Sequence, residues 1–400
     1  MWRLVHTTNF HMRYFLLVLA LTFGLMPLAG QTTEPLLFFP VSPYLQNVSP
    51  TAVTVMYQSG GSVHSWVEVG RDSLHITAYR QLAGGQEVVH DDEHKVRIEG
   101  LEPGATYYYR VCATEILTNQ AYKKEFGRTV KTPFYKMTLP ADTTRNFTAI
   151  VLNDLHGVGE LVAQMARLAD SIKPDFVVFN GDCLSEPATR QQAWQMVHSL
   201  TTAFHGTSTP CIFVRGNHEI RNAYSSGMLS LFDWPGGQTY HAFSWGDTRF
   251  VVLDCGEDKP DDTWVYYGLN DFTGFRSAQV DFLQKETAGK AYRQARHHVF
   301  IHHIPLWAEE EPQDPGAVSK PCRALWTPVL KKADIYVALN GHTHRFRHYA
   351  AGESGCLYPV VVGGGPSLKS ATMTIVREQN KTLSLEIINA QGQTFKKINL

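Results

Sequence analysis

The fold is decided by residues 147–182, which are FTAIVLNDLHGVGELVAQMARLADSIKPDFVVFNGD. Residues 147–153 and 175–180 are short apolar runs of the kind found in buried strands, and residues 160–172 between them carry apolar side chains at helical spacing. A strand, a helix and a second strand in this order predict a βαβ unit, with parallel strands and a helix that covers one face of the sheet.

The same alternation continues toward the carboxyl end of the chain. Further helices are predicted near residues 191–204 and 278–292, and further strands at residues 211–215, 298–302, 335–340 and 358–362. The chain after about residue 140 is therefore predicted to be an α/β domain.

Residues 43–140 have a different pattern of short, alternating runs separated by turns. Strands are predicted at residues 52–57, 66–69, 95–98 and 107–113, which is typical of an all-β sandwich. Pro103 and Gly104 close a turn before the last of these strands, so Tyr107 is expected to form a hydrogen bond back across the corner.

The composition argues against some classes of protein. The 400 residues are 44% hydrophobic, which is enough for substantial cores, and the formal net charge is −1. A chain with so little net charge has no basic face for a polyanion, which argues against a nucleic-acid scaffold role.

Residues 1–30 are predicted to be a signal peptide. Arg3 and Arg13 precede an apolar run at residues 14–28, and small residues follow before Gln31. The apolar run is shorter than the roughly 20 residues that span a bilayer, and no later segment approaches that length. We therefore expect a secreted or periplasmic mature chain without a transmembrane segment.

The six cysteines are scattered without the close pairs of a structural zinc site. We expect most of them to be buried as small apolar side chains, and Cys322 with Cys356 is the candidate disulfide.

Five separated segments near predicted strand ends contain side chains that bind metals. They are Asp154-Leu155-His156, Gly181-Asp182, Gly216-Asn217-His218-Glu219, His302-His303-Ile304-Pro305 and Gly341-His342-Thr343-His344. Each alone is more often a helix cap or a satisfied polar residue, but four predicted strands end directly in such a segment, in an order that a single parallel sheet would bring to one edge. Carboxylate, imidazole and amide donors together suit ions such as zinc, manganese or iron. The glycines at positions 181, 216 and 341 are expected to let the backbone turn sharply.

This ordered set resembles the calcineurin-like metallophosphoesterase signature of DxH, GDxx, GNHE, HxP and GHxH. The front domain, with Pro43-Tyr44-Leu45-Gln46-Asn47 and the run at residues 103–111, is similar to the fibronectin III-like N-terminal domain of purple acid phosphatases. The resemblance implies a four-layer α/β/β/α metallophosphoesterase sandwich in residues 141–400, preceded by a small all-β fibronectin III-like sandwich in residues 31–140.

The resemblance, carried over residue by residue, implies two divalent or trivalent metal ions held by seven ligands. Asp154, His156 and His344 would bind the first ion, Asn217, His303 and His342 would bind the second, and Asp182 would bind both. The His-x-Pro spacing favours His303 over His302, which strand alternation turns toward the opposite face. Ser185 stands where purple acid phosphatases carry a metal-binding tyrosine, so a purple ferric centre is not expected.

Other side chains near these motifs are expected to support the chemistry. His218 either donates a proton to the leaving group or orients the phosphate, and the alternative is a histidine that only caps the following helix. Arg215 either binds phosphate or forms a salt bridge at the strand end. Glu219 and His302 are expected to support the ligands from behind, with Glu219 orienting His218 or a neighbouring loop.

Two further segments carry open alternatives. The aromatic side chains of residues 257–274 either overhang the pocket and contact the leaving group or pack within their own loop, and the second is preferred. Residues 363–366, Gly-Gly-Gly-Pro, predict a tight turn in preference to an anion-binding nest.

The sequence thus predicts an exported enzyme that hydrolyses a phosphomonoester by metal-activated hydroxide. A phosphodiesterase that acts on small diesters or nucleotides is the first alternative, because many diesterases share the His-containing first motif. The second alternative is a non-catalytic surface or periplasmic binding protein whose front domain contacts a glycan or a protein.

Overall fold

The computed structural model describes residues 38–72, 74–141, 146–309 and 316–400. The predicted signal peptide lies outside these residues. Among the residues described, no helix is both long enough and apolar enough to cross a lipid bilayer.

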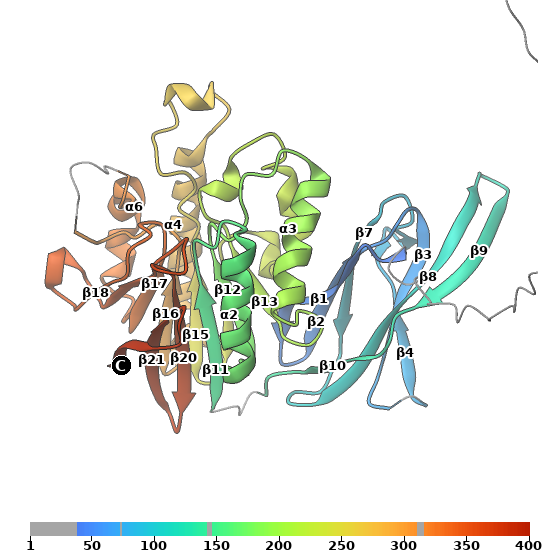
Figure 1. Cartoon of the computed structure of the whole chain (residues 1–400), viewed down its shortest axis with the longest axis horizontal. Helices are drawn as coiled ribbons and strands as arrows, with labels where there is room; N and C mark the ends of the chain where they lie inside the picture. The colour runs from blue at the N-terminus through green and yellow to red at the C-terminus, as the bar shows by residue number, and fades with distance from the viewer. Residues whose placement is uncertain (1–37, 73, 142–145, 310–315) are drawn as a thin grey trace, which may run out of the picture. The chain divides into compact units, whose positions relative to one another are not determined.

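The front domain is a sandwich of two antiparallel sheets, as predicted (Figure 1). One sheet contains β1 (Val41–Ser49), β2 (Ala52–Gln58) and β7 (Glu93–Glu99). The other contains β3 (Val63–Gly70), β4 (Ile76–Tyr79), β8 (Thr106–Asn119), β9 (Lys124–Lys131) and β10 (Tyr135–Thr138). A small separate hairpin of β5 (Leu82–Ala83) and β6 (Gln86–Glu87) comes between β4 and β7 in the sequence. The predicted corner bond is confirmed, because the Glu102 backbone N–H donates to the Tyr107 hydroxyl at 3.0 Å.

The second domain contains two six-stranded mixed sheets. The first runs in the order β13 (Cys211–Val214), β12 (Phe176–Asn180), β11 (Phe147–Leu152), β20 (Thr372–Gln379), β21 (Thr382–Asn389) and β22 (Thr394–Asn399). The second runs in the order β14 (His241–Trp245), β15 (Thr248–Val252), β16 (His297–Ile301), β17 (Val337–Asn340), β19 (Val360–Val362) and β18 (Arg347–Tyr349).

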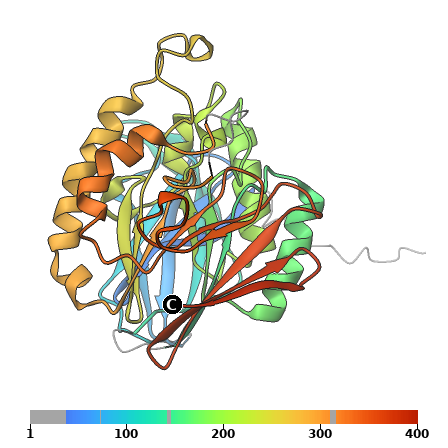
Figure 2. The same cartoon turned by 90° about the vertical axis from the view of Figure 1, so that its left-hand side faces the viewer.

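Helices cover the outer face of each sheet, so the predicted α/β/β/α sandwich is confirmed (Figure 2). Helices α2 (Gly159–Ile172) and α3 (Arg190–Ala203) pack on the first sheet. Helices α4 (Phe272–Ala288), α5 (Lys290–Gln294) and α6 (Lys320–Leu330) pack on the second. A third apolar core, which includes Phe176, Phe250 and Ile301, fills the space between the two sheets.

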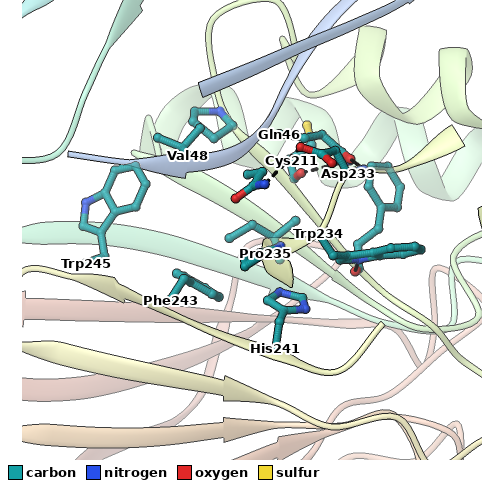
Figure 3. A pocket seen from close by; sticks show the side chains of 13 residues that line it. Gln46, Val48, Cys211, Asp233, Trp234, Pro235, His241, Phe243 and Trp245 are labelled. Carbon is teal, nitrogen blue, oxygen red and sulfur yellow. Dashed lines mark hydrogen bonds between the residues drawn. The ribbon is translucent and has the colours of Figure 1, made fainter. Parts of the chain in front are cut away.

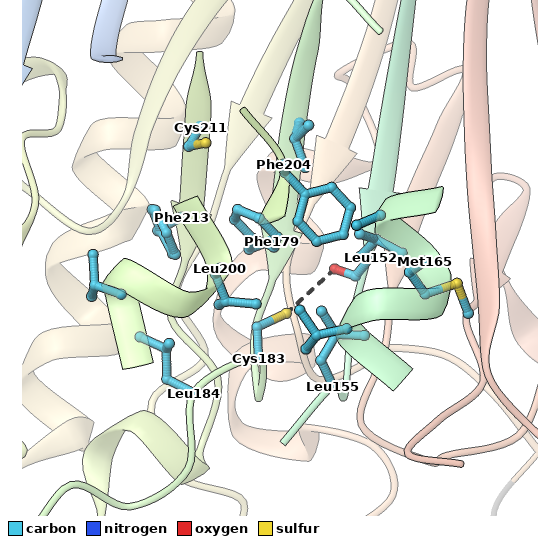
Figure 4. Packing of buried hydrophobic residues seen from close by; sticks show 14 of the residues in the cluster. Leu152, Leu155, Met165, Phe179, Cys183, Leu184, Leu200, Phe204, Cys211 and Phe213 are labelled. Atoms are coloured by element: carbon cyan, nitrogen blue, oxygen red, sulfur yellow. Dashed lines mark hydrogen bonds between the residues drawn. The ribbon is translucent and has the colours of Figure 1, made fainter. Parts of the chain in front are cut away.

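The layer beneath α2 and α3 holds the strand ends that lead to the candidate site (Figure 4). Phe179 is fully buried there, and the Cys183 thiol donates to the Leu152 carbonyl oxygen at 3.7 Å. Leu152 of β11 pairs with Phe179 of β12, which pairs with Phe213 of β13. The three strands therefore end at nearly the same level.

The front domain contacts the second domain through side chains of β1. The Tyr44 hydroxyl donates to the Leu231 carbonyl oxygen at 2.5 Å, and Gln46 accepts from the Asp233 backbone N–H at 2.7 Å. The Gln46 amide also donates to the Cys211 carbonyl oxygen at 3.3 Å, beside a cavity of about 20 Å³ (Figure 3). This volume suits one water molecule, and none of the predicted metal ligands lines the cavity.

All six cysteines are buried and unpaired. The expectation of small buried side chains is confirmed, and the candidate disulfide between Cys322 and Cys356 is wrong. Cys322 lies instead beside Cys255, to whose carbonyl oxygen its thiol donates at 3.8 Å.

The predicted helix at residues 278–292 differs from the structure at both ends. Helix α4 begins at Phe272, six residues earlier, because Asp271 caps it by accepting from the Gly274 backbone N–H. It ends at Ala288, and Gly289, with an extended backbone, separates it from α5. The sequence also failed to predict the antiparallel strands β20, β21 and β22, which extend the first sheet.

One buried histidine makes the stability of the front domain depend on pH. His94 stacks on Tyr57 at a ring distance of 4.7 Å and bonds the Ser59 hydroxyl at 2.9 Å. Burial lowers the pKa of His94 from 6.5 to about 4. Only the unfolded chain therefore takes up this proton as the pH falls from 6.5 to about 4, so the folded state loses up to about 3 kcal/mol over that interval.

Replacement His94→Gln should flatten this part of the pH dependence, because glutamine does not titrate. Denaturant midpoints at pH 4.5 and 7.5 measure it, with exposed His90→Gln as the matched control. An equal loss of stability on acidification in the His94 and His90 variants would contradict the prediction.

Candidate metal centre

The predicted ligands follow the carboxyl ends of five parallel strands that belong to two different sheets. Asp154 and His156 follow β11, Asp182 follows β12, Asn217 follows β13, His303 follows β16, and His342 and His344 follow β17. The expectation of a single parallel sheet is therefore wrong. The segments meet because the edges of two stacked sheets coincide.

Asn180 connects the two sheets at this edge. Its side-chain amide donates to the Leu339 carbonyl oxygen of β17 at 3.1 Å, across the sandwich. Its own carbonyl oxygen accepts from Nδ1 of His303 at 2.9 Å. Because a carbonyl can only accept, Nδ1 of His303 carries the hydrogen in this contact, and Nε2 is left as the coordinating atom.

One cluster of donors is formed by Asp154, His156 and His344. Nε2 of His344 lies 3.3 Å from Oδ1 of Asp154, and Nε2 of His156 lies 3.9 Å from the same oxygen. The two imidazole Nε2 atoms are 3.1 Å apart. These three side chains therefore place one donor atom each within 4.8 Å of the others, the arrangement of a metal site.

A second cluster is formed by Asp182, His303 and His342, with Asn217 beside it. Nε2 of His303 lies 3.0 Å from Oδ2 of Asp182, and Nδ1 of His342 lies 2.9 Å from Oδ1 of Asn217. Oδ1 of Asp154 is 3.8 Å from Nε2 of His303, so the two clusters are adjacent. The structure thus brings all seven predicted ligands together.

Five of these seven residues have left-handed backbones, which non-glycine residues seldom adopt. The φ angles are 51° for Asp154, 47° for His156, 50° for Asp182, 76° for His342 and 58° for His344. Such conformations cost of order 1–3 kcal/mol each and persist where the surrounding structure holds them. The strain turns consecutive side chains of each loop toward one point.

Two of the signature glycines make room for ligands and do not make turns. A Cβ atom on Gly216 would lie 2.3 Å from Oδ1 of Asp182, and one on Gly341 would lie 2.6 Å from Oδ2 of Asp154. The predicted turn role holds only for Gly181, whose φ is 77°. At the other two positions it is wrong, since neither has a positive φ.

The glycine run after β19 has the same role, which the sequence did not indicate. A Cβ atom on Gly363 would lie 2.0 Å from Oδ1 of Asn153, and one on Gly365 would lie 2.6 Å from Cβ of Asp154. Asn153 in turn donates to Oδ2 of Asp154 at 2.6 Å. The run therefore packs against the back of a ligand, where a larger residue would displace it.

The donor set fits a metal centre on grounds of hydrogen bonding. Oδ1 of Asp154 and Nε2 of His303 are fully buried and have no hydrogen-bond partner. The 3.0 Å approach of His303 to Asp182 lacks hydrogen-bond geometry, so Nε2 of His303 is left without a partner. Buried polar atoms are almost always satisfied, and a cation between them would satisfy these.

The electrostatics of the pocket also favour positive charge. Burial disfavours a proton on His303, but Asp182 and Asp154 outweigh burial and raise its pKa to about 10. A buried pair of carboxylates requires a compensating charge, and a metal ion supplies it without a proton.

Glu219 supports the ligands from behind, whereas the described bonds of His302 go to Ile304 and Asn340. Oε2 of Glu219 accepts from the backbone N–H groups of Asp182 and Gly216, each at 2.8 Å, and Oε1 accepts from Leu184 at 2.9 Å. Glu219 therefore fixes the neighbouring loop and does not orient His218. His302 is buried away from the donors, and its Nδ1 donates to the Ile304 carbonyl oxygen at 2.8 Å.

His218 lies at the edge of the centre and is partly exposed. Its Nε2 is 3.9 Å from Oδ2 of Asp182, and its ring packs edge-on against His156 at 4.6 Å. Nδ1 lies 2.9 Å from Oε1 of Glu186, and Nε2 accepts from Nη1 of Arg221 at 3.1 Å. The side chain makes no helix-capping bond in the short helix η1 (His218–Ile220), so the capping alternative is wrong.

Arg215 forms the salt bridge that was one of its two predicted roles. Its Nε lies 2.7 Å from Oδ2 of Asp254, which is fully buried, and its guanidinium carbon lies 5.2 Å from the ring centre of Phe275. A phosphate contact from Arg215 would require this ion pair to open.

Two aromatic rings of the loop at residues 257–271 are exposed, whereas the hydroxyl of Tyr266 is buried. Trp264 is 76% exposed and Tyr267 is 81% exposed, so the preferred prediction is wrong for these two rings. Phe272 is buried, but as the first residue of α4.

The fold and the site define a metal-dependent phosphoric ester hydrolase. The chain belongs to the calcineurin-like phosphoesterase family, whose model matches residues 147–346, half of the sequence. Residues 40–126 match the family described as the N-terminal domain of purple acid phosphatases.

Curated relatives include serine/threonine-protein phosphatase CPPED1 from two mammals. The Mus musculus protein is 26% identical over 243 residues, which are 57% of this chain and 75% of that protein. The Pongo abelii protein is 26% identical over 180 residues, 43% of this chain and 54% of that protein. The match thus spans about half the length of the second relative.

Two solved structures share the fold over 90% of this chain. Purple acid phosphatase PPD1 from Lupinus luteus seeds has a TM-score of 0.67 at 14% identity, with 74% of that chain covered. PhoD has a TM-score of 0.59 at 14% identity, with 89% covered. At these identities the likeness is one of fold.

The close contacts of the glycines predict which substitutions weaken metal binding. Gly216→Ala places a methyl group against Asp182 and should lower metal affinity by about 10- to 100-fold, the range for residues that hold ligands in place. Metal content after dialysis and the unfolding midpoint are the measurements. Gly159→Ala is the matched control, since nothing lies within 4 Å of its added Cβ. A Gly216→Ala protein with unchanged metal affinity would show that the tight contact does not matter.

Proposed function

We propose that the chain is an exported phosphatase that hydrolyses phosphomonoesters at a centre of two metal ions. The observation that carries the proposal is the pair of adjacent donor clusters, which meet where Nε2 of His303 lies 3.8 Å from Oδ1 of Asp154.

In this proposal each cluster holds one ion. Asp154, His156 and His344 would hold the first ion, Asn217, His303 and His342 would hold the second, and Asp182 would contribute to both. The oxygen and nitrogen donors suit zinc, manganese or iron. When bound, two such cations supply the Lewis acidity that polarises a phosphate ester and acidifies an attacking water.

The chain's own residues contribute position and proton handling. Asp154 and Asp182 are buried, so bulk water cannot compete for their oxygens. The bonds from Glu219 to the backbone of residues 182, 184 and 216 hold the loop that carries the bridging carboxylate. His218 presents Nε2 toward the centre, where an imidazole can orient the phosphate or protonate a leaving oxygen.

A monoester substrate is favoured over a diester by the relatives of both domains. The front domain matches the purple acid phosphatase N-terminal family, and the CPPED1 relatives are named as phosphatases. His156 favours the diesterase alternative, because many diesterases share the His-containing first motif, and Ser185 stands where purple acid phosphatases carry a metal-binding tyrosine. Ser185, at the position of that tyrosine, lies 3.4 Å from Nδ1 of His156.

Export and a role for the front domain complete the proposal. The order of basic, apolar and small residues in the first 30 positions supports secretion or export to the periplasm. The exposed aromatic residues Tyr122 and Phe126 of the β8–β9 hairpin are consistent with a glycan or protein contact there.

The proposal predicts two ions per chain and turnover of 4-nitrophenyl phosphate faster than of its bis-ester. Asp182→Asn should lower turnover more than the roughly 10- to 100-fold that loss of a ligand-supporting residue costs, because the bridging charge itself is lost. Elemental analysis and phosphate release with zinc, manganese and iron supplied separately are the measurements.

The control is Asp281→Asn, which changes an exposed carboxylate on α4. Faster turnover of the bis-ester would support the diesterase alternative. Fewer than two ions per chain, with neither ester hydrolysed, would support the non-catalytic binding protein.

A further inference from the structure

Arg221 approaches the metal centre, although no sequence motif singled it out. It directly follows the short helix η1 (His218–Ile220). Residues three apart lie above one another in a 3-10 turn, so Arg221 shares a side with His218. Its Nη1 lies 3.1 Å from Nε2 of His218, which is 3.9 Å from Oδ2 of the proposed bridging ligand Asp182.

Two carboxylates hold the other side of this guanidinium. Nε and Nη2 donate to the two oxygens of Glu257 at 3.1 and 2.9 Å, and Nη2 also donates to Asp258 at 3.3 Å. The Glu257 side chain is fully buried, while the Arg221 side chain is 27% exposed. The two-point contact orients the planar group and leaves Nη1 on the side of the centre, where Oε1 of the half-exposed Glu186 also lies 3.8 Å from it.

We propose that Arg221 is the residue that binds the phosphate group of the substrate, with Glu257 as its positioning residue. Nη1 now donates to Nε2 of His218, and an anionic phosphate oxygen would be a stronger acceptor, because both partners of that bond would be charged. The inference rests on the proposed function, because the phosphate is that of the ester at the proposed metal centre.

Arg215 provides the matched comparison. It is 14% exposed and paired with the fully buried Asp254, and the shortest of its ring contacts is to Phe275 at 5.2 Å. Both arginines are therefore held by buried carboxylates, but only Arg221 contacts His218 among the described bonds of the two. Substitution of either should disturb an ion pair, whereas only substitution at Arg221 should change phosphate affinity.

The test is binding of orthophosphate to the full-length, metal-loaded protein by calorimetry, together with KM for 4-nitrophenyl phosphate. Arg221→Gln should weaken orthophosphate binding and raise KM by about 10-fold or more, the equivalent of one charge-assisted hydrogen bond. Arg215→Gln should leave both within about 2-fold. Arg221→Lys should restore part of the affinity, because a single ammonium keeps the charge but not the fork.

Metal content is measured in every variant, so that loss of the ions is not mistaken for loss of the arginine. If Arg221→Gln fails to fold because Glu257 is left unpaired, the double variant Arg221→Gln with Glu257→Gln removes that charge and gives the same expected loss of affinity. Orthophosphate affinity within 2-fold of the unchanged protein in a folded variant would overturn the proposal. An equal loss in Arg215→Gln, or no orthophosphate binding by the unchanged protein, would overturn it too.

A failure of the proposed function gives a different result. If the unchanged protein binds orthophosphate through Arg221 but hydrolyses no ester, catalysis is excluded and the phosphate-binding role of Arg221 stands.

Discussion

The candidate centre depends on the contact between two sheets at their carboxyl edges. No single strand carries a complete ligand set, so the side chains converge only where the sheets are held in register with each other. Asn180 of the first sheet makes that connection, because its side-chain amide and its carbonyl oxygen are both bonded to residues of the second sheet, Leu339 and the ligand His303. The apolar core between the sheets makes up the rest of their contact. The hydrogen bond from His303 to the Asn180 carbonyl oxygen sets the position of His303 at the edge.

Two features set the ligand geometry at this edge: strained backbone conformations, and glycines that leave room for the ligand carboxylates. Five ligand residues adopt left-handed conformations. Glycines occupy the neighbouring positions at which a methyl group would overlap a ligand carboxylate. Glu219 offsets part of the strain, since three backbone N–H groups from two loops share its buried carboxylate. Burial raises the pKa of Glu219 to about 7, so the cluster as a whole benefits from nearby positive charge.

Much of this could be predicted because the decisive signals are local. Buried strands such as 147–153 and the ligands directly after them are readable from periodicity and spacing, and the His-x-Pro spacing together with strand alternation separates His303 from His302. The division into two sheets was not predicted from spacing, because pairing between distant strands leaves no local pattern. Arg221 was missed for a similar reason: its partners Glu257 and Asp258 lie 36 and 37 residues away, and only the folded chain brings them together.

The crowded glycines have an implication for how such an enzyme could change its preference. Where only a hydrogen atom fits behind a carboxylate, mutation has almost no freedom, so the reactive centre is a fixed component of the scaffold. Most of the loop at residues 257–271 is exposed and is under no such restriction. Its buried first residue, Glu257, binds Arg221, which approaches the centre. New selectivity can therefore arise in that loop by insertion or exchange of side chains while the chemistry beneath it stays constant.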